Sequence, residues 1–177
     1  QGLMGGINAV RYIQQKEPII LQRSDGYIGV LIDDLISKGS KEPYRMMTSR
    51  AEFRLLLRQD NADQRLTPIG HEIGLISDER YEALLEKERQ TEAEIERVKA
   101  LTITPAKETL ELLEQYGSTP IKSGVKLADL IKRPELDYEK LAPLDKERPE
   151  LPAPVREQVN IQIKYEGYIS QQLKQVE

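Results

Sequence analysis

The alternation of apolar and polar residues that half-buried strands require is essentially absent from this chain. Apolar residues instead recur at helical spacing, most clearly over Ser77–Leu101 and Val155–Glu177. A length of 177 residues is enough to bury a hydrophobic core. Because the sequence has no Trp and one Phe, that core must be built from Leu, Ile, Val and Tyr. We therefore predict a mainly α fold, an irregular multi-helix domain.

Capping residues, glycines and prolines mark where the individual helices begin and end. Ser24 and Asp25 are candidate N-caps for one helix, and Gly39 lies just past its end. The predicted helices are Gln1–Gln15, Tyr27–Ser37, Ser49–Gln59, a short one that Thr67 and Pro68 open and that ends near Gly74, Ser77–Leu101, one from Thr104 to Gly117, Val125–Ile131 and Val155–Glu177. Residues 134–154 contain five prolines and many charges, which indicates an irregular connection.

The residue types that are missing exclude several functions. Without Cys the chain has no disulfide, no Cys-based metal site and no thiol nucleophile. His71 is the only histidine, and no further ligands accompany it at metal-binding spacing, so we expect no metal site. No apolar stretch approaches ~18 residues and no signal peptide is present, so we expect a cytoplasmic protein without a membrane span. A net charge of −4 leaves any nucleic-acid contact to a local patch.

Both ends of the chain predict a segment excised from a longer protein. The sequence starts at Gln1-Gly2 without Met. Its last predicted helix has no Gly or Pro stop signal before Glu177. We therefore expect the parent protein to continue beyond this segment.

The most informative stretch is Ser49–Leu66, which carries arginines at regular spacing. Arg50, Arg54 and Arg58 are four residues apart, so on the predicted helix they form one stripe that covers ~80° of the circumference. Apolar residues flank this stripe, which is therefore no ordinary solvated face. No Lys occurs between residues 42 and 86, and the exclusive use of Arg favours planar, bidentate recognition of anions.

Two interpretations of the stripe remain open. In the first, Asp60 and Asp63 fold back onto the arginines and form a structural salt-bridge cluster that pins the loop. Glu52 projects ~160° away from Arg54 on the same helix and is not expected to pair with it. In the second, the arginines form a ridge that contacts RNA phosphates, and polar neighbours orient them. The candidate RNA-binding residues are then Arg45, Arg50, Arg54, Arg58, Arg65 and Asn61.

Other polar and aromatic residues have simpler interpretations. Asp33 and Asp34 are adjacent on a predicted helix, so their side chains point ~100° apart and a catalytic carboxylate pair is disfavoured. Tyr165 and Tyr168 could stack on RNA bases, but core packing of the last helix is the favoured interpretation. The Glu-rich stretch 78–96 is predicted to be a solvated face, with a surface for a basic partner as the alternative.

The run Glu42–Leu66, EPYRMMTSRAEFRLLLRQDNADQRL, closely resembles the signature of the MnmG family, also called GidA. That family is the large subunit of the tRNA uridine 5-carboxymethylaminomethyl modification enzyme. The first residues, QGLMGGINAV, are similar to its last flavin-domain helix, and YIGVLIDDLISKG is similar to the segment that follows. RPELDYEKL and QVNIQIKYEGYI resemble its later helical region. The resemblance therefore covers nearly the whole chain.

The resemblance implies a function for the parent protein. Members of this family bind FAD, use NADH as reductant, form homodimers and work with a GTPase subunit, MnmE. Together they add an aminomethyl or carboxymethylaminomethyl group to C5 of the tRNA wobble uridine, with a folate supplying the one-carbon unit. The C-terminal helical region is implied to bind and position tRNA. The alternative is a protein-interaction or dimerisation module that contacts the GTPase partner without touching RNA.

The resemblance also implies a division of this chain. Residues 1–25 are the end of the FAD-binding domain, and residues 26–177 belong to the C-terminal helical domain. The candidate cofactor-binding residues are Gly2, Gly5, Gly6 and Asn8, which fall on the flavin-domain helix. The chain has no GxGxxG fingerprint and none of the family's catalytic cysteines. We therefore expect no catalytic residue here, and expect the chain alone to be inactive and to bind neither FAD nor NADH.

Overall fold

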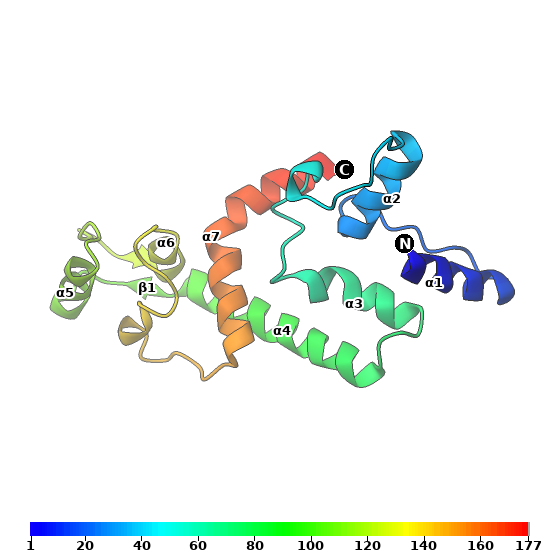
Figure 1. Cartoon of the computed structure of the whole chain (residues 1–177). Coiled ribbons are helices and arrows are strands. Elements are labelled where there is room, and N and C mark those ends of the chain that lie inside the picture. Colours follow the sequence, from blue (N-terminus) through cyan, green and yellow to red (C-terminus); the bar gives the residue numbers. More distant parts are fainter. Residues whose placement is uncertain (177) are drawn as a thin grey trace. The chain divides into compact units, whose positions relative to one another are not determined.

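The computed structural model describes residues 1–176, apart from the side chains of Gln172, Leu173, Gln175 and Val176. The helices are α1 (Gly2–Ile13), α2 (Tyr27–Ser37), α3 (Ala62–Glu72), α4 (Asp78–Ala100), α5 (Lys107–Gln115), α6 (Leu127–Ile131) and α7 (Ala153–Val176) (Figure 1). A 3₁₀ turn, η1 (Thr48–Arg50), lies between α2 and α3, and a second, η2 (Ala142–Leu144), lies between α6 and α7. Strands β1 (Thr102–Ile103) and β2 (Val125–Lys126) pair in antiparallel register. The prediction of a mainly α fold is confirmed.

The chain divides into two compact units. The first contains Gln1–Leu84 and the residues from Ile169 onward, and the second contains Leu85–Tyr168. The boundary predicted after residue 25, between a flavin domain and a helical domain, stays a prediction, because one compact unit can contain parts of two domains of a longer chain. Among the described residues, no helix is both long and apolar enough to cross a membrane.

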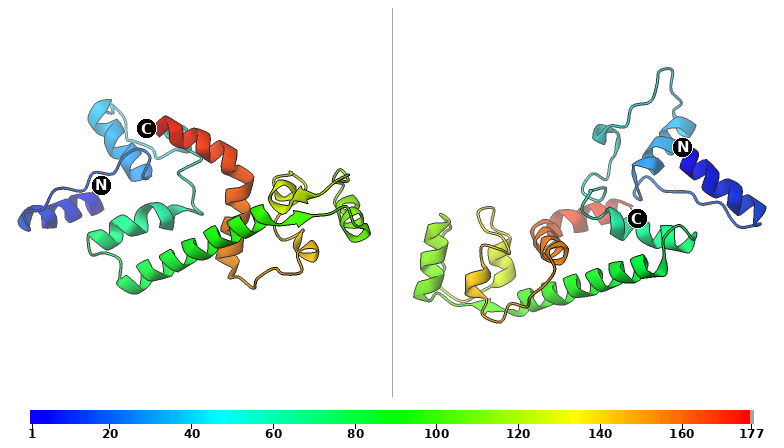
Figure 2. Two further views of the ribbon diagram at one scale, coloured as in Figure 1. Left: turned by 180° about the vertical axis from the view of Figure 1, so that it is seen from behind. Right: turned by 60° about the horizontal axis from the view of Figure 1, so that its bottom comes forward.

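The second unit has the larger hydrophobic core. The small sheet lies beside α6 (Figures 1 and 2). The buried residues of this core come from the end of α4, from β1, α5, α6 and α7, and from the connections between α5 and β2 and between α6 and α7: Val98, Ile103, Leu113, Ile121, Leu127, Ala128, Leu130, Ile131, Leu136, Tyr138, Leu141, Val155, Val159 and Ile163. Residues 134–152 are irregular as predicted, apart from η2, whereas Ala153 and Pro154 already belong to α7. Leu136 and Leu141 of this connection are buried.

A buried polar network lies within the second unit. The Tyr138 hydroxyl donates to Glu94 Oε1 at 2.7 Å, and the Arg97 guanidinium donates to both Glu94 oxygens at 2.8 Å. Asp145 accepts a further hydrogen bond from Arg97 Nη1 at 3.1 Å. Burial, and then the Glu94 carboxylate, raise the pKa of Tyr138 above its ordinary value. The network therefore gives buried charged groups the partners that their burial requires.

Removal of the Tyr138 hydroxyl tests this network. Tyr138→Phe deprives the buried Glu94 carboxylate of one hydrogen bond, and we expect the free energy of unfolding to fall by about 2 kcal/mol. Tyr165→Phe is the matched control, because Tyr165 is 44% exposed and its replacement should change stability by less than about 0.5 kcal/mol. Urea denaturation followed by circular dichroism measures both, and equal values for the two variants would contradict the role given to Tyr138.

The first unit has a smaller apolar core and relies on polar contacts. Val30, Ala51 and Leu57 are its buried cluster, with Tyr27 packed against them. Gly29 lies so close to the preceding chain that a Cβ there would sit 2.1 Å from the Gln22 carbonyl oxygen. This contact brings the start of α2 against the segment that precedes it.

Most predicted helices are present, and α2 has the predicted bounds. The left-handed residues Gly39, at φ 67°, and Gly117, at φ 64°, follow α2 and α5 as predicted. The short helix predicted to end near Gly74 is present and ends at Glu72, but its predicted start at Thr67-Pro68 is wrong, because α3 begins at Ala62 and contains Pro68. No strand was predicted, whereas the first two residues of the predicted helix Val125–Ile131 form β2.

The core packing predicted for the tyrosines of the last helix is wrong. Tyr165 is 44% exposed and Tyr168 is 62% exposed. Leu173 and Val176 continue the apolar spacing of the predicted helix Val155–Glu177, and their side chains lie outside the described residues. The buried face of α7 is formed instead by Val155, Val159 and Ile163.

Candidate functional site

The predicted helix Ser49–Gln59 is absent, so its arginines form no helical stripe. The chain makes the short turn η1 and then a series of further turns up to α3. Side chains occupy carbonyls that a continuous helix would use: Arg58 Nη1 donates to Leu55 O, and Asn61 Nδ2 donates to Leu56 O at 2.9 Å. Local side-chain bonds of this kind compete with helix formation, and here they hold the loop in its own conformation.

Two of the candidate arginines bind the protein itself: Arg58 lies in this loop, and Arg65 lies in the first turn of α3. Arg58 pairs with Asp60 through two hydrogen bonds of 2.9 and 3.1 Å, the contact that the salt-bridge interpretation predicted. Arg65 donates to Asn61 Oδ1 at 3.0 Å, to Arg58 O at 2.9 Å and to Asp25 O. Burial, followed by the nearby Arg58 charge, lowers the pKa of Arg65. The donors of Arg58 and Arg65 therefore bind the protein itself, and Asn61 is buried between them.

The other three candidate arginines are exposed. Arg45 and Arg54 make no hydrogen bond or ion pair with the part of the chain that the structure describes. The Arg50 guanidinium lies over the Tyr44 ring, 4.4 Å from its centroid, and makes no hydrogen bond or ion pair within residues 1–176. A cation–π contact of this kind uses none of the N–H hydrogen bonds, so the N–H groups of Arg50 are available to an anion.

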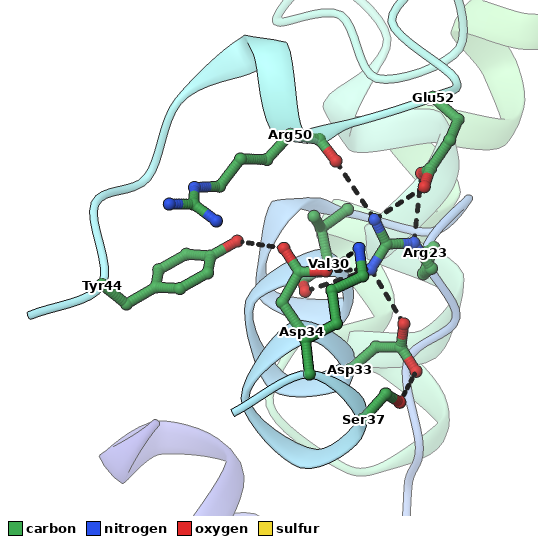
Figure 3. A network of polar contacts seen from close by, with 9 residues as sticks. Arg23, Val30, Asp33, Asp34, Ser37, Tyr44, Arg50 and Glu52 are labelled. Carbon is green, nitrogen blue, oxygen red and sulfur yellow. Dashed lines mark hydrogen bonds and ion pairs between the residues drawn. The ribbon is translucent and has the colours of Figure 1, made fainter. Parts of the chain in front are cut away.

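A residue that sequence reasoning missed, Arg23, connects the loop to α2 (Figure 3). Its Nη1 donates to Asp33 Oδ2 and to Asp34 Oδ1, both at 2.8 Å. Its Nε and Nη2 donate to the two Glu52 oxygens at 3.1 and 2.8 Å, and Nη2 also donates to Arg50 O at 3.1 Å. One guanidinium thus joins two carboxylates of α2 to the residues that follow η1.

Asp34 is the most heavily engaged carboxylate of this network. Its side chain is 4% exposed and accepts hydrogen bonds from Tyr44 Oη at 2.6 Å, Arg23 Nη1 at 2.8 Å and Lys38 Nζ at 3.0 Å. The Tyr44 hydroxyl, then Arg23 and Lys38, hold the pKa of Asp34 well below its usual range. Asp33 and Asp34 are both ion-pair partners of Arg23, and the expectation that they form no catalytic pair stays a prediction.

The hydrogen bond between Asp34 and Tyr44 predicts that the stability of the protein depends on pH. The lowered pKa of Asp34 means that its contribution to stability is present above the ordinary value of 3.8 and is lost as the pH falls through the lowered value. Burial and Asp34 raise the pKa of Tyr44, so its contribution is present below the ordinary value of 10.0 and is lost as the pH rises through the raised value.

We therefore expect Tyr44→Phe to destabilise the protein at pH 7 and to lose this effect at strongly alkaline pH. Urea denaturation at a series of pH values gives the difference in the free energy of unfolding between wild type and variant. Tyr12→Phe, at a side chain that is 84% exposed, should show no difference at any pH. A Tyr44→Phe difference that persists unchanged through the alkaline range would contradict the assigned hydrogen bond.

The candidate cofactor residues lie on α1. A Cβ at Gly2, Gly5 or Gly6 would meet no atom within 4 Å, so the backbone is open to approach at all three. Asn8 is engaged instead: its amide donates to Ile19 O at 3.0 Å and accepts from Ile19 N at 2.7 Å. A groove of about 660 Å³ lies between α1 and the residues that follow α3, and Gly2 and Gly6 line it.

The single histidine is engaged within the protein. His71 Nε2 lies 2.6 Å from Asp78 Oδ1, and its ring stacks on Tyr81 with the centroids 4.2 Å apart. Within residues 1–176 no group of three or more His, Cys, Asp or Glu residues is arranged to hold a metal ion. His71 therefore fixes the connection between α3 and α4.

Comparisons with known proteins agree on one family. The family model for the tRNA modifying enzyme MnmG/GidA C-terminal helical domain matches residues 78–173. The tRNA uridine 5-carboxymethylaminomethyl modification enzymes MnmG of Caldicellulosiruptor saccharolyticus and Lachnoclostridium phytofermentans are 59% and 61% identical to this chain over 177 residues. Each alignment covers 100% of this chain and 28% of the relative, so the chain spans little more than a quarter of these proteins.

Solved structures give the same result. Aquifex aeolicus GidA in its form II crystal superposes with a TM-score of 0.81 at 37% identity, over 96% of this chain and 26% of that one. The form I crystal gives a TM-score of 0.80 at 39% identity, over 99% of this chain and 26% of that one. The similarity therefore extends over both compact units.

Proposed function

Because the chain belongs to the MnmG/GidA family of tRNA-modifying enzymes, we propose that it binds and positions tRNA within a larger enzyme. That enzyme uses FAD and NADH to modify C5 of the tRNA wobble uridine, as a cytoplasmic homodimer that works with the GTPase subunit MnmE. This chain supplies no catalytic residue in this proposal. Its contribution is to hold the RNA, while the flavin chemistry belongs to other parts of the enzyme.

The observation that carries the proposal is a difference among the five candidate arginines: three have N–H groups without a hydrogen bond within the described residues, and two bind the protein itself. Arg45, Arg50 and Arg54 are exposed, and their guanidinium N–H groups make no hydrogen bond within the described chain, so we assign them to tRNA phosphates. Arg58 and Arg65 are turned inward. We assign them and Asn61 to shaping the loop that presents the other three.

A net charge of −4 does not oppose this assignment. Phosphate contacts depend on local positive charge, and no lysine lies between residues 42 and 86 to compete with the arginines in this stretch. The exposed Met46 and Met47 lie between Arg45 and Arg50, and apolar side chains of this kind contact nucleobases. The segment therefore combines the two kinds of contact that an RNA chain offers.

We also propose that the open face of α1 lies against FAD in the whole enzyme. The glycines fit such a contact, because at Gly2, Gly5 and Gly6 a bound group can approach the backbone without meeting a side chain. The Asn8 amide is occupied by Ile19 and so supports the helix and its following segment rather than the cofactor. FAD supplies electron transfer when bound, and the chain alone is expected to bind neither FAD nor NADH.

A second candidate function is contact with protein, either between the two subunits of a homodimer or with MnmE. The observation that favours it is the exposed apolar surface of α1, where Tyr12 is 84% and Ile13 is 79% exposed. Patches of this kind mark contacts with other proteins or domains. This contact and tRNA binding involve different residues and can both operate.

The experiment that tests the main proposal is a titration of labelled tRNA with the whole enzyme at several salt concentrations. Binding through exposed arginines predicts an affinity that falls steeply as salt rises, because phosphate contacts release counterions. Retention of MnmE by this chain in the absence of RNA tests the second candidate separately. A tRNA affinity that does not depend on salt would overturn the assignment of the arginines to phosphates.

A further inference from the structure

We propose that Arg23, acting through Asp34 and Tyr44, is a positioning residue that holds the exposed Arg50 in the orientation that binds an RNA phosphate. The inference rests on the proposed function, and it adds a residue outside the arginine-rich segment to the RNA-binding machinery. Arg23 itself is 19% exposed and turned into the protein, so its effect on RNA must be exerted through Arg50.

Two sets of contacts, which we call the two arms, hold Arg50 in place. The first arm fixes the backbone of Arg50. Arg23 Nη2 donates to Arg50 O at 3.1 Å, and the same nitrogen donates to Glu52 Oε1 at 2.8 Å. Arg23 Nη1 is meanwhile anchored on α2 by Asp33 and Asp34 at 2.8 Å each. A planar guanidinium with donors on two edges can bridge the helix and the loop in this way.

The second arm fixes the side chain of Arg50. Asp34 Oδ2 accepts the Tyr44 hydroxyl at 2.6 Å, which holds the phenol ring in place, and the Arg50 guanidinium lies over that ring at 4.4 Å. Figure 3 shows the two arms meeting at Arg50, with its carbonyl turned toward Arg23 and its side chain beside Tyr44. Asp34 belongs to both arms, because its other oxygen accepts from Arg23.

This arrangement reduces the cost of ordering Arg50 when RNA binds. A free arginine side chain loses rotamer entropy when it is immobilised, and prior ordering removes part of that cost. The N–H groups of the Arg50 guanidinium make no hydrogen bond within the described residues, and a guanidinium can bind a phosphate through two parallel hydrogen bonds. The ligand chemistry is therefore a phosphodiester of the RNA backbone.

A double-mutant cycle in the whole enzyme tests the proposal. Arg23→Lys keeps the positive charge, but a single ammonium cannot bridge α2, Glu52 and Arg50 O at once. We expect it to weaken tRNA binding on the order of tenfold when Arg50 is present and less than about twofold in an Arg50→Ala background. Arg89→Lys is the matched control, at a 68% exposed arginine paired with Glu86, and should change affinity in neither background.

The results of the cycle decide whether Arg23 acts on tRNA binding through Arg50. An equal loss in both backgrounds would overturn the proposal, because Arg23 would then act on binding without Arg50. An Arg50→Ala variant with unchanged affinity would overturn it as well, while a loss of affinity in Arg45→Ala/Arg54→Ala would show that the proposed function stands. If Arg23→Lys fails to fold, Tyr44→Phe serves in the same cycle, since it removes the Asp34 hydrogen bond and keeps the ring beneath Arg50.

Discussion

Replacement of Arg45 and Arg54 by alanine in the whole enzyme is expected to weaken tRNA binding on the order of 100-fold at low salt. Each lost arginine–phosphate contact is estimated to cost about 1.4 kcal/mol, which is a factor of about ten in affinity. Neither side chain has a hydrogen-bonding or ion-pair partner within the described chain, so the substitutions remove no contact that stabilises the fold. The affinity change therefore reports on RNA contact alone.

The matched control removes the same amount of charge elsewhere. Arg80 and Lys122 are exposed and likewise have no side-chain partner within the described residues. Arg80→Ala/Lys122→Ala should therefore leave tRNA affinity within about threefold of wild type, because the two residues lie outside the segment that we assign to tRNA phosphates and exposed charges are screened by salt. Equal losses in the two double variants would show that the effect is one of net charge and not of a defined interface.

Gly29→Ala is expected to destabilise the first compact unit by about 3 kcal/mol. The new Cβ would lie 2.1 Å from Gln22 O and 2.9 Å from Leu21 O, both of which are backbone atoms that cannot rotate away. Relief of the clash moves α2 away from the segment that carries Arg23, and the network around Asp34 is lost with it. Urea denaturation monitored by circular dichroism gives the change in the free energy of unfolding.

Gly5→Ala provides the control for Gly29→Ala in this chain. A Cβ at Gly5 meets no atom within 4 Å, and the residue lies inside α1. Alanine should therefore stabilise the helix by about 0.5–1 kcal/mol. If Gly29→Ala were as well tolerated as Gly5→Ala, the close approach of α2 to Gln22 would be wrong.

The helices could be predicted from sequence where the apolar spacing and the end signals agree. Over Tyr27–Ser37 the apolar residues recur at helical spacing and Gly39 follows, and α2 has the predicted bounds. The stretch Ser49–Gln59 also has helical spacing, yet it forms turns, because Arg58 and Asn61 bind its carbonyls. Periodicity records which residues can share a face, and it does not record side chains that compete for the backbone.

The candidate site could be predicted only in part for a related reason. The pairing of Arg58 with Asp60 was one of two interpretations, since these residues are close in sequence. Arg23 was missed because its partners Asp34 and Glu52 lie 11 and 29 residues away. The adjacent acids on α2 were the available signal, because a buried carboxylate such as Asp34 requires a counter-charge.

The salt dependence of tRNA binding tests the central claim most directly. The slope of log affinity against log salt concentration is measured for the whole enzyme, for Arg45→Ala/Arg54→Ala and for Arg80→Ala/Lys122→Ala. If the two arginines contact phosphates, their removal makes the slope shallower by roughly 1.4, at about 0.7 for each single-strand contact, and the control keeps the wild-type slope. An Arg45→Ala/Arg54→Ala variant that retains the wild-type slope and affinity would contradict the claim that this segment binds tRNA.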